Sequence, residues 1–420
     1  MSEARLKAPR GTFDVLGEDA CARTAIEARA RAVLGGAGYE RIETPAFEST
    51  ELFARGVGES TDIVRKEMFT FEDAGGRSLT LRPEGTAPVC RAYVEHGMHK
   101  RRQPVKLWYL SSFFRHERAQ AGRFRQFWQV GAEVLGSDDP AVDAEAIALL
   151  ATLLDELEVR DVRLRLSSLG GPEARSAYRE LLQSHLRARA DELSEDVRER
   201  VDLNPLRAFD SDHPGTRAVM KDAPRLLDHL DGADTEHFAA VCALLDTAGV
   251  RYGIDPTLVR GLDYYTRTVF EFTSDALGAQ SGVGGGGRYD GLVEMLGGPH
   301  TPGMGWAAGI ERLMLAGTPP VPSASAVELF IAIDGDGGEL RGEAFELLSQ
   351  ARSAGVTAQL DLGGRSLKGQ LGHAAALDAR FVAIIRDGGG VALRDVQARE
   401  ERDIAAAQVV HAVLRGHHAL

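Results

Sequence analysis

The strongest constraint on the fold is a pair of strand-like segments that flank a short loop rich in arginine. The segments are residues 105–115 and 126–135, and both are rich in the aromatic and β-branched residues typical of strands. Two neighbouring antiparallel strands can be joined by a hairpin, whereas two parallel strands need a long crossover. Similar segments at residues 39–45, 78–82 and 266–273 add strands. We therefore predict an α+β fold, an antiparallel sheet with flanking helices, in preference to a doubly wound parallel sheet.

A proline-rich segment at residues 316–326 divides the chain. It contains three prolines among small residues, and such a segment continues neither a helix nor a central strand. We predict a catalytic domain over residues 1–325, with a helical insertion at about 172–250, and a C-terminal α/β domain over residues 326–420. In the second domain, strands expected at 327–333, 356–362, 380–386 and 391–396 alternate with helices expected at 339–354, 366–379 and 404–414.

Charge and cysteine content indicate the cellular setting. The formal net charge of −13 argues against a general nucleic-acid coat, because neutralising phosphates needs a basic surface. Three cysteines, Cys21, Cys90 and Cys242, lie far apart without a CxxC pair, which favours a reducing compartment. Residues 1–10 have no apolar core, and no apolar run approaches the roughly 18 residues of a membrane span. We expect a cytoplasmic protein without a membrane partner.

The average charge conceals a basic block beside an acidic one. Residues 91–130 carry a net charge of +7, and residues 131–160 carry −7. The basic block includes the hairpin loop, where Arg115, Arg118, Arg123 and Arg125 face a single acid, Glu117. Clustered guanidinium groups are suited to binding several phosphates, so the loop predicts an oligophosphate site.

The second strand of the hairpin has one apolar and one polar face. Period-two alternation places Phe127, Gln129, Gly131 and Glu133 on one face and Trp128, Val130, Ala132 and Val134 on the other. On the polar face, Gly131 leaves a concave patch in which a small ligand could approach the backbone, and Phe127 could stack on a flat ring. A solvated outer face would have the same pattern, so from this strand alone both interpretations stay open.

The glycine run at residues 282–287 formally matches GxGxxG. A dinucleotide-binding fold also needs an acid about 20 residues further on, and residues 297–309 contain none. We interpret the glycines as allowing either a close backbone approach to a ligand or a tight turn. The chain has no P-loop, no HExxH pair and no GxSxG elbow, and its scattered histidines His96, His99 and His116 are not spaced as metal ligands, so no metal site is predicted.

Together these motifs resemble the class II aminoacyl-tRNA synthetases. The hairpin from Phe114 to Glu133 resembles motif 2, residues 303–313 resemble motif 3, and the helix before residues 38–45 resembles the dimer-forming motif 1. Within that class, residues 9–14, 81–86 and above all 258–265 are similar to the histidyl-tRNA synthetases. Ala119, Trp128 and Trp306 depart from frequent family residues, and Trp128 is expected to point away from the pocket face.

The resemblance implies a function and a set of roles. It implies a homodimeric histidine–tRNA ligase that activates L-histidine with ATP and Mg²⁺ to histidyl-adenylate and pyrophosphate and then transfers histidine to the 3′ end of tRNA(His). The C-terminal domain would read the anticodon, and residues 363–371 resemble the reading element. The implied histidine-binding residues are Glu84, Thr86, Gln129, Glu133, Tyr264 and Tyr265; the implied ATP-binding residues are Arg115, Arg123, Phe127 and Arg312; and Arg260 and Arg115 would act in catalysis.

Two other functions are weighed against this one. A regulatory paralogue of these synthetases, which pairs with the first enzyme of histidine biosynthesis, typically lacks the anticodon domain and part of the string around Arg260, and this chain has both. A nucleotide-dependent oxidoreductase would rest only on the glycines of residues 282–287.

Overall fold

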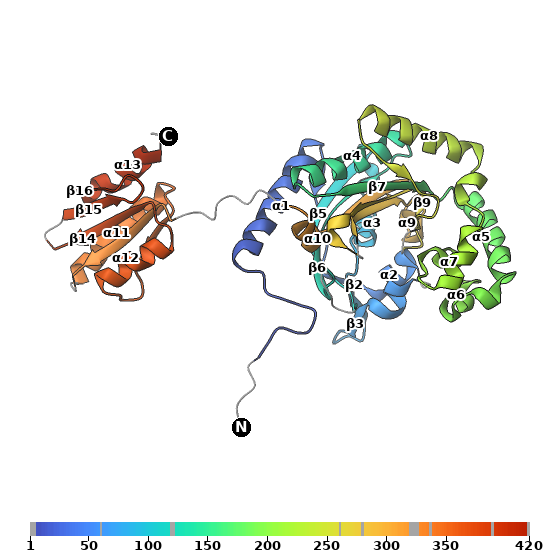
Figure 1. Ribbon diagram of the computed structural model, residues 1–420, viewed down its shortest axis with the longest axis horizontal. Helices are drawn as coiled ribbons and strands as arrows, with labels where there is room; N and C mark the ends of the chain where they lie inside the picture. The colour runs from blue at the N-terminus through green and yellow to red at the C-terminus, as the bar shows by residue number, and fades with distance from the viewer. Residues whose placement is uncertain are drawn as a thin grey trace, which may run out of the picture. The chain divides into compact units, whose positions relative to one another are not determined.

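The chain forms two compact units, Met1–Pro320 and Val321–Leu420 (Figure 1). The computed structural model describes residues 6–58, 61–117, 122–259, 262–278, 281–318, 327–335, 338–387 and 390–417. Each unit has its own sheet and its own hydrophobic core. Among the described residues, no helix combines the length and the apolar character that crossing a membrane requires.

An eight-stranded sheet forms the centre of the first unit. Each adjacent pair among its six inner strands is antiparallel, and a short strand at each edge pairs in parallel with the strand beside it. This confirms the predicted α+β fold with an antiparallel sheet, except that the segment expected as a strand at residues 39–45 is reduced to two residues. In spatial order the strands are β1 (Glu40–Arg41), β5 (Val105–Phe114), β6 (Gln126–Leu135), β11 (Gly303–Gly309), β10 (Gly282–Arg288), β9 (Thr266–Ser274), β7 (Val162–Ser168) and β8 (Gly253–Ile254).

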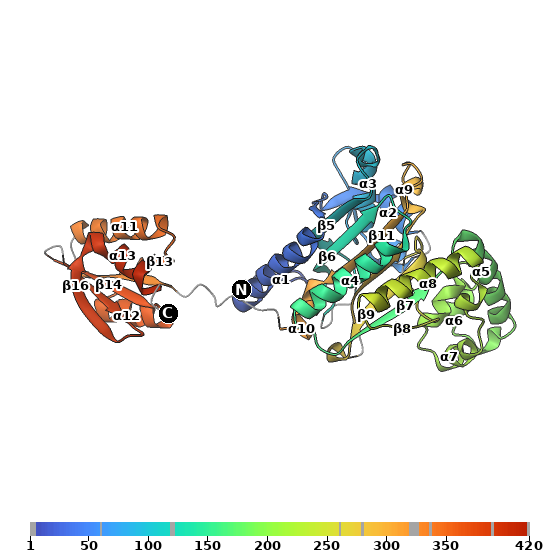
Figure 2. The same cartoon turned by 90° about the horizontal axis from the view of Figure 1, so that it is seen from above.

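Helices cover the apolar face of this sheet (Figure 2). They are α1 (Gly17–Gly36), α4 (Pro140–Glu156), α8 (Gly232–Thr247) and α10 (Ile310–Ala316). Helix α4 begins where Asp139 accepts a hydrogen bond from the Ala141 N–H and Pro140 occupies the first turn, a favourable helix start. Its Ile147 and Leu150 pack in one core with Val130 and Val134 of β6, which supplies the apolar face that the sequence predicts.

The opposite face of the sheet packs on α3 (Thr86–Glu95) and on the helical segment after β7. Smaller elements complete this side: α2 (Thr50–Val57), α9 (Leu292–Met295), and a three-stranded sheet of β2 (Phe47–Ser49), β4 (Ser78–Leu81) and β3 (Phe69–Glu72). A π-helical turn at Ile63–Glu67 follows α2, and a 3-10 turn at Met98–Lys100 follows α3. A further 3-10 turn at Asp275–Leu277 joins β9 to β10 of the main sheet.

The segment between β7 and β8 consists of helices and turns, without a strand in its described residues. It contains α5 (Pro172–Arg187), α6 (Glu195–Arg200), α7 (Pro214–Lys221), α8 and 3-10 turns at Ala190–Glu192, Pro205–Asp210 and Leu226–His229. The helices belong to two cores. Val241 and Leu245 of α8 pack with α4, whereas Tyr178 and Leu182 of α5 belong to a cluster with α6 and α7. We refer to residues 172–229 as the helical region.

The second unit is a five-stranded mixed sheet in the order β13 (Ala358–Leu360), β12 (Leu329–Asp334), β14 (Phe381–Arg386), β15 (Gly390–Asp395) and β16 (Glu400–Ala405). The sequence did not predict β16. Helices α11 (Gly338–Ser353) and α13 (Ala406–His417) pack on one face, and α12 (Leu367–Ala376) packs on the other. The buried amide of Gln370 on α12 accepts from the Ile333 N–H at 2.8 Å and donates to the Ile333 carbonyl at 3.0 Å, which fixes α12 to the end of β12.

Candidate active site

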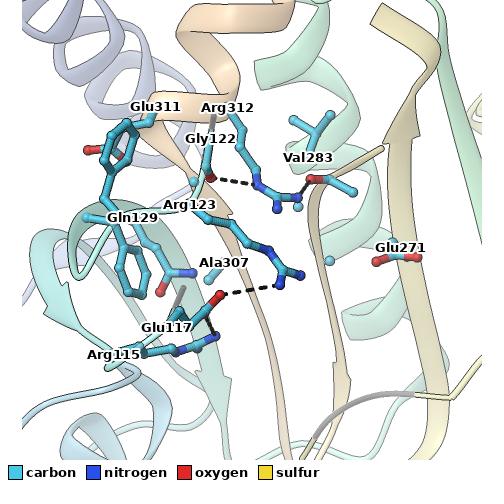
Figure 3. Close-up of a pocket in the computed structure, with 16 residues that line it drawn as sticks. Arg115, Glu117, Gly122, Arg123, Gln129, Glu271, Val283, Ala307, Glu311 and Arg312 are labelled. Carbon is cyan, nitrogen blue, oxygen red and sulfur yellow. Dashed lines mark hydrogen bonds and ion pairs between the residues drawn. The ribbon is translucent and has the colours of Figure 1, made fainter. Parts of the chain in front are cut away.

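A cavity of about 370 Å³ lies where β6, β10, β11 and the hairpin loop meet (Figure 3). The four predicted ATP-binding residues, Arg115, Arg123, Phe127 and Arg312, all line it, and so does Gln129. The remaining lining residues are Glu117, Gly122, Phe124, Glu271, Gly282, Val283, Gly284, Gly285, Ala307, Gly309 and Glu311.

Two of the cavity's guanidinium groups are paired with one carboxylate. Glu117 lies 3.4 Å from Arg123 Nη1 and 3.9 Å from Arg115 Nη1, as the dashed lines in Figure 3 show. These are long ion pairs, and pairs of this kind contribute little to stability. An incoming anion can therefore displace Glu117 at small cost.

Two cavity arginines are also fixed by backbone carbonyls. Arg115 Nε donates to the Pro83 carbonyl at 2.9 Å, and its guanidinium stacks 5.3 Å from the centre of the Phe127 ring. Arg312 near the start of α10 donates to the carbonyls of Gly122 and Gly282. Burial lowers the pKa of Arg312, and the positive charge of Arg123 lowers it further. Such a crowded, partly desolvated cluster of cations favours binding of a polyanion.

The glycine run forms strand β10 in the middle of the sheet, so the tight turn considered for it is wrong. Gly282, Gly284 and Gly285 line the cavity. A Cβ atom at Gly284 would lie 2.8 Å from Cβ of Ala308, and one at Gly287 would lie 2.6 Å from the Thr268 carbonyl oxygen. These glycines therefore allow a close backbone approach, both to the neighbouring strands and to the cavity.

Further along the same face of β6, the fully buried Glu133 forms a cluster with three hydroxyl groups. Thr86 Oγ1 and Tyr109 Oη donate to Oε1 of Glu133 at 2.8 and 3.4 Å, and Tyr289 Oη donates to Oε2 at 2.6 Å. Burial raises the pKa of Glu133 to about 8, against the three hydroxyl groups, which lower it. Glu133 is 0% exposed, so the polar face of β6 is not a solvated outer face at this residue.

Glu84 lies at the beginning of α3, beside this cluster. Its two carboxylate oxygens accept hydrogen bonds from the N–H groups of Thr86 at 2.7 Å and Ala87 at 3.0 Å, which would otherwise lack helical partners. Burial raises the pKa of Glu84, and the two N–H groups oppose the rise. Each oxygen keeps a second lone pair that can accept from a ligand.

The two adjacent tyrosines complete the cluster. The rings of Tyr264 and Tyr265 are buried with centres 4.8 Å apart, and the Tyr264 ring lies 5.8 Å from that of Tyr289. Burial raises the pKa of Tyr264 well above its usual value. Of the six predicted histidine-binding residues, five thus belong to the cluster around Glu133. The sixth, Gln129, lines the cavity on the same face of β6.

Sequence reasoning missed Tyr109 and Tyr289. It also assigned the space beside Gly131 to a ligand, and this is wrong, because the Tyr109 ring fills that space. A Cβ atom at Gly131 would lie 2.7 Å from Cε2 of Tyr109, and one at Gly85 would lie 2.6 Å from its hydroxyl oxygen. The strand register contains the missing signal, since Tyr109 pairs directly with Gly131.

Several predicted features lie elsewhere. Arg260, Arg118 and Ala119 lie outside the described residues. Trp128 lies on the helix-covered side, with Arg23 of α1 stacked 4.9 Å from its ring centre, and Trp306 is buried in the same core. Within the described ranges, no three His, Cys, Asp or Glu side chains gather closely enough to hold a metal ion.

Comparison with known proteins assigns this architecture to one family. The family model described as histidyl-tRNA synthetase matches residues 11–313. The chain is similar to histidine–tRNA ligases of Desulforamulus reducens, with 46% identity over 96% of this chain and 97% of that one, and of Thermosynechococcus vestitus, with 48% identity over 90% and 89%.

A solved structure supports the same assignment. The apo histidyl-tRNA synthetase of S. aureus superposes with a TM-score of 0.82 at 35% identity, covering 97% of this chain and all of that one. An ATP phosphoribosyltransferase regulatory subunit/histidyl-tRNA synthetase from Bacillus halodurans superposes with a TM-score of 0.66 at 24% identity and covers 92% of this chain, which shows a shared fold only.

Proposed function

Because this chain belongs to the histidyl-tRNA synthetase family, we propose that the cavity over β6, β10 and β11 binds ATP and that the cluster around Glu133 recognises histidine. The chain is an aminoacyl-tRNA synthetase: it activates histidine with ATP to histidyl-adenylate and pyrophosphate and transfers histidine to tRNA(His). What is proposed here is the role of each residue. The high identity to ligases and the presence of a C-terminal unit both disfavour a purely regulatory role.

The buried carboxyl of Glu133 is the observation that carries the histidine site. An imidazole ring needs a polar partner on each nitrogen, and a pocket built for one leaves its own polar groups unpaired when an apolar isostere enters. Glu133 and Tyr265, with Tyr264 beside it, supply such partners. Glu84, Thr86 and Gln129 would accept from the α-ammonium group, for which Glu84 has the spare lone pairs.

The arginine-lined cavity is suited to ATP. Arg115 would bind the α-phosphate, Arg123 and Arg312 would bind the outer phosphates, and Phe127 would stack on adenine. Glu117 pairs with Arg115 and Arg123, so ATP binding would exchange this one carboxylate for several phosphate oxygens. The glycines of β10 allow the nucleotide to lie directly against the backbone.

The first step needs no side-chain nucleophile. The histidine carboxylate attacks the α-phosphate and pyrophosphate leaves, so the protein contributes orientation and positive charge. Arg115 supplies charge on one side of the α-phosphate, and the family resemblance assigns the other side to Arg260. Any Mg²⁺ would be held mainly by ATP oxygens, as is usual for this ion, with Glu117 and Glu271 as cavity carboxylates. The oxygens of Glu311 are engaged by Arg23 and by the Trp128 N–H.

The remaining proposals concern partners. We propose that the second unit binds the anticodon through residues 363–371, and that α1 and the segment after it form a homodimer interface. These assignments rest on the resemblance of the motifs. A cytoplasmic location stays a prediction from the dispersed cysteines.

ATP–pyrophosphate exchange tests the two halves of the site separately. The wild-type protein should exchange with histidine alone among the twenty amino acids. Glu133→Gln should raise the KM for histidine by about 10- to 100-fold, the loss expected when a buried polar group is left without its matched partner, and leave the KM for ATP within about twofold. Arg312→Met should raise the KM for ATP by a similar factor and leave the KM for histidine within about twofold.

The exposed Arg55, which pairs with Glu51 on α2, provides a matched control as Arg55→Met. It should leave both KM values unchanged. Equal effects of Glu133→Gln and Arg312→Met on both substrates would contradict the proposed division of the site.

A further inference from the structure

The helical region makes direct polar contacts with the segment that carries Tyr264 and Tyr265. Figure 2 shows α5, α6 and α7 grouped at the end of the sheet where β7 and β8 lie. From this group, Arg175 of α5 and Asn204 reach back to residues 263–265. Neither residue lines the proposed ATP cavity.

Arg175 donates hydrogen bonds to two backbone carbonyls of this segment. Its Nη1 atom donates to the Asp263 carbonyl at 3.0 Å and to the Tyr265 carbonyl at 2.7 Å. These two carbonyls lie on either side of Tyr264. A single guanidinium nitrogen thus joins both peptide groups and limits rotation of the backbone that carries the Tyr264 ring.

Asp263 is fixed from two further directions. Its Oδ1 atom accepts from Asn204 Nδ2 at 3.1 Å, and its N–H donates to the Val57 carbonyl at 3.3 Å. Gly58 lies so close that a Cβ atom there would be 2.7 Å from Asp263 Oδ2. Residue 263 is therefore held between the end of α2 and the helical region.

After Tyr265, the chain is anchored at Arg267 to residues that flank the helical region in sequence, Gly170 before it and Asp234 after it. Arg267 has a left-handed backbone, with φ of 44°, which is unfavourable for a side chain of its kind. Its Nε atom donates to Asp234 Oδ1 of α8 at 2.9 Å, and its N–H donates to the Gly170 carbonyl at 2.9 Å. These contacts hold Arg267 in place, so the segment has little freedom at either end.

We propose that Arg175 is a positioning residue for histidine recognition, which acts by holding the backbone on both sides of Tyr264. Through this contact the rings of Tyr264 and Tyr265 stay against the Glu133 cluster. A displacement of α5 would release them, so the affinity for histidine depends on the position of the helical region. The inference rests on the proposed histidine site.

Arg179 provides a matched control. It lies one turn further along α5 and also donates to two backbone carbonyls, those of Asp202 and Leu203, but both belong to the helical region itself. Arg175→Met and Arg179→Met therefore each remove one arginine that binds carbonyls, and only the first contact reaches the tyrosine segment.

The test compares both variants in ATP–pyrophosphate exchange and thermal unfolding. Arg175→Met should raise the KM for histidine about tenfold, the size of one or two lost hydrogen bonds, with the KM for ATP within about twofold of wild type. Arg179→Met should leave both KM values near wild type. Arg175→Lys keeps a cationic donor but not the guanidinium geometry, so it should show a smaller rise in the KM for histidine, of about threefold.

Equal KM values for the two methionine variants, or a parallel rise for both substrates in Arg175→Met, would overturn the inference. If Arg175→Met does not fold, Arg175→Lys is compared with Arg179→Lys in the same assay. A rise in the KM for histidine but not for ATP, seen in Arg175→Lys and not in Arg179→Lys, supports the proposal. The absence of this rise refutes it. Glu133→Gln separates the two hypotheses. If it raises the KM for histidine while the Arg175 variants do not, only the positioning role fails; if it has no effect, the histidine site itself is wrong.

Discussion

The hydroxyl of Tyr289 reaches the Glu133 carboxyl at 2.6 Å across an intervening strand. Glu133 lies in β6 and Tyr289 directly follows β10, with β11 between them. Gly305 of β11 pairs with Glu133, and a Cβ atom there would lie 2.6 Å from the Glu133 Cδ atom. Gly303 likewise leaves room for the Tyr289 ring, since its Cβ would lie 2.6 Å from Cδ2 of that ring. Two glycines of β11, the motif 3 strand, thus leave the space in which the Tyr289 hydroxyl contacts the Glu133 carboxyl.

Tyr289→Phe tests this contact. Removal of this short hydrogen bond should raise the KM for histidine by about 10-fold in ATP–pyrophosphate exchange, because it leaves the buried carboxyl without its closest partner, at a cost of about 1–3 kcal/mol. Tyr109→Phe removes the longer 3.4 Å contact and should have a smaller effect. A larger rise in the KM for histidine in Tyr109→Phe than in Tyr289→Phe would refute the prediction that the shorter hydrogen bond contributes more.

The raised pKa of Glu133 predicts a dependence of stability on pH. Burial raises this pKa to about 8 in the folded protein, above its usual value of 4.5. Between these values the folded state keeps a proton that the unfolded state releases, so stability falls as pH rises, by up to about 1.4 kcal/mol per pH unit. Glu133→Gln cannot titrate. Chemical unfolding from pH 5 to 8 should therefore show the wild type losing stability relative to this variant; parallel curves would contradict the prediction.

Gly131→Ala should be strongly destabilising. The added Cβ would overlap the buried Tyr109 ring, and overpacking of this kind costs about 1–3 kcal/mol. Chemical unfolding measures the loss, and histidine-dependent exchange should fall with it because Tyr109 contacts Glu133. Gly35→Ala provides the control: a Cβ in the last turns of α1 meets no atom within 4 Å, and alanine favours a helix, so stability should stay equal or rise slightly.

A buried ion pair directly precedes Tyr289. Arg288 and Asp143 of α4 are both 0% exposed, with Arg288 Nη2 at 2.6 Å from Asp143 Oδ1. Asp143→Asn should lower the free energy of unfolding by about 3 kcal/mol, because the buried guanidinium loses the nearer of its carboxylate partners and Asp290, at 3.2 Å, compensates only in part. Arg288→Met added to Asp143→Asn should recover part of this loss. Glu51→Gln, which breaks the exposed pair with Arg55, should change stability by less than about 1 kcal/mol.

The long strands could be predicted from sequence because their alternation matches their burial. Strand β6 begins and ends at the predicted residues, and its apolar face lies in the core. Strand β16 was missed because four of its six residues, Glu400 to Asp403, are charged. Its pairing with β15 makes it a strand, and charged side chains are common on such sheet edges, where they discourage pairing with another chain.

The proposed site could be predicted only in part. The polar residues of β6 and the arginines of its loop lie close together in the sequence, so their shared chemistry is visible there. Tyr289 lies 156 positions from Glu133, and the two meet only because the glycines of β11 lie between them. The contacts of Arg175 with the tyrosine segment are equally invisible in the sequence, since they depend on how α5 packs against residues 263–265.

Strand β10 has consequences for local opening of the protein. Five of its seven residues are glycine, so it has few side chains of its own to pack, and its place depends on the ladders to β9 and β11. A ligand that fills the cavity binds only when this strand is in place, and so disfavours its opening. Amide hydrogen exchange at Gly284–Gly287 should therefore slow when ATP binds, which makes this glycine-rich strand a direct reporter of occupancy.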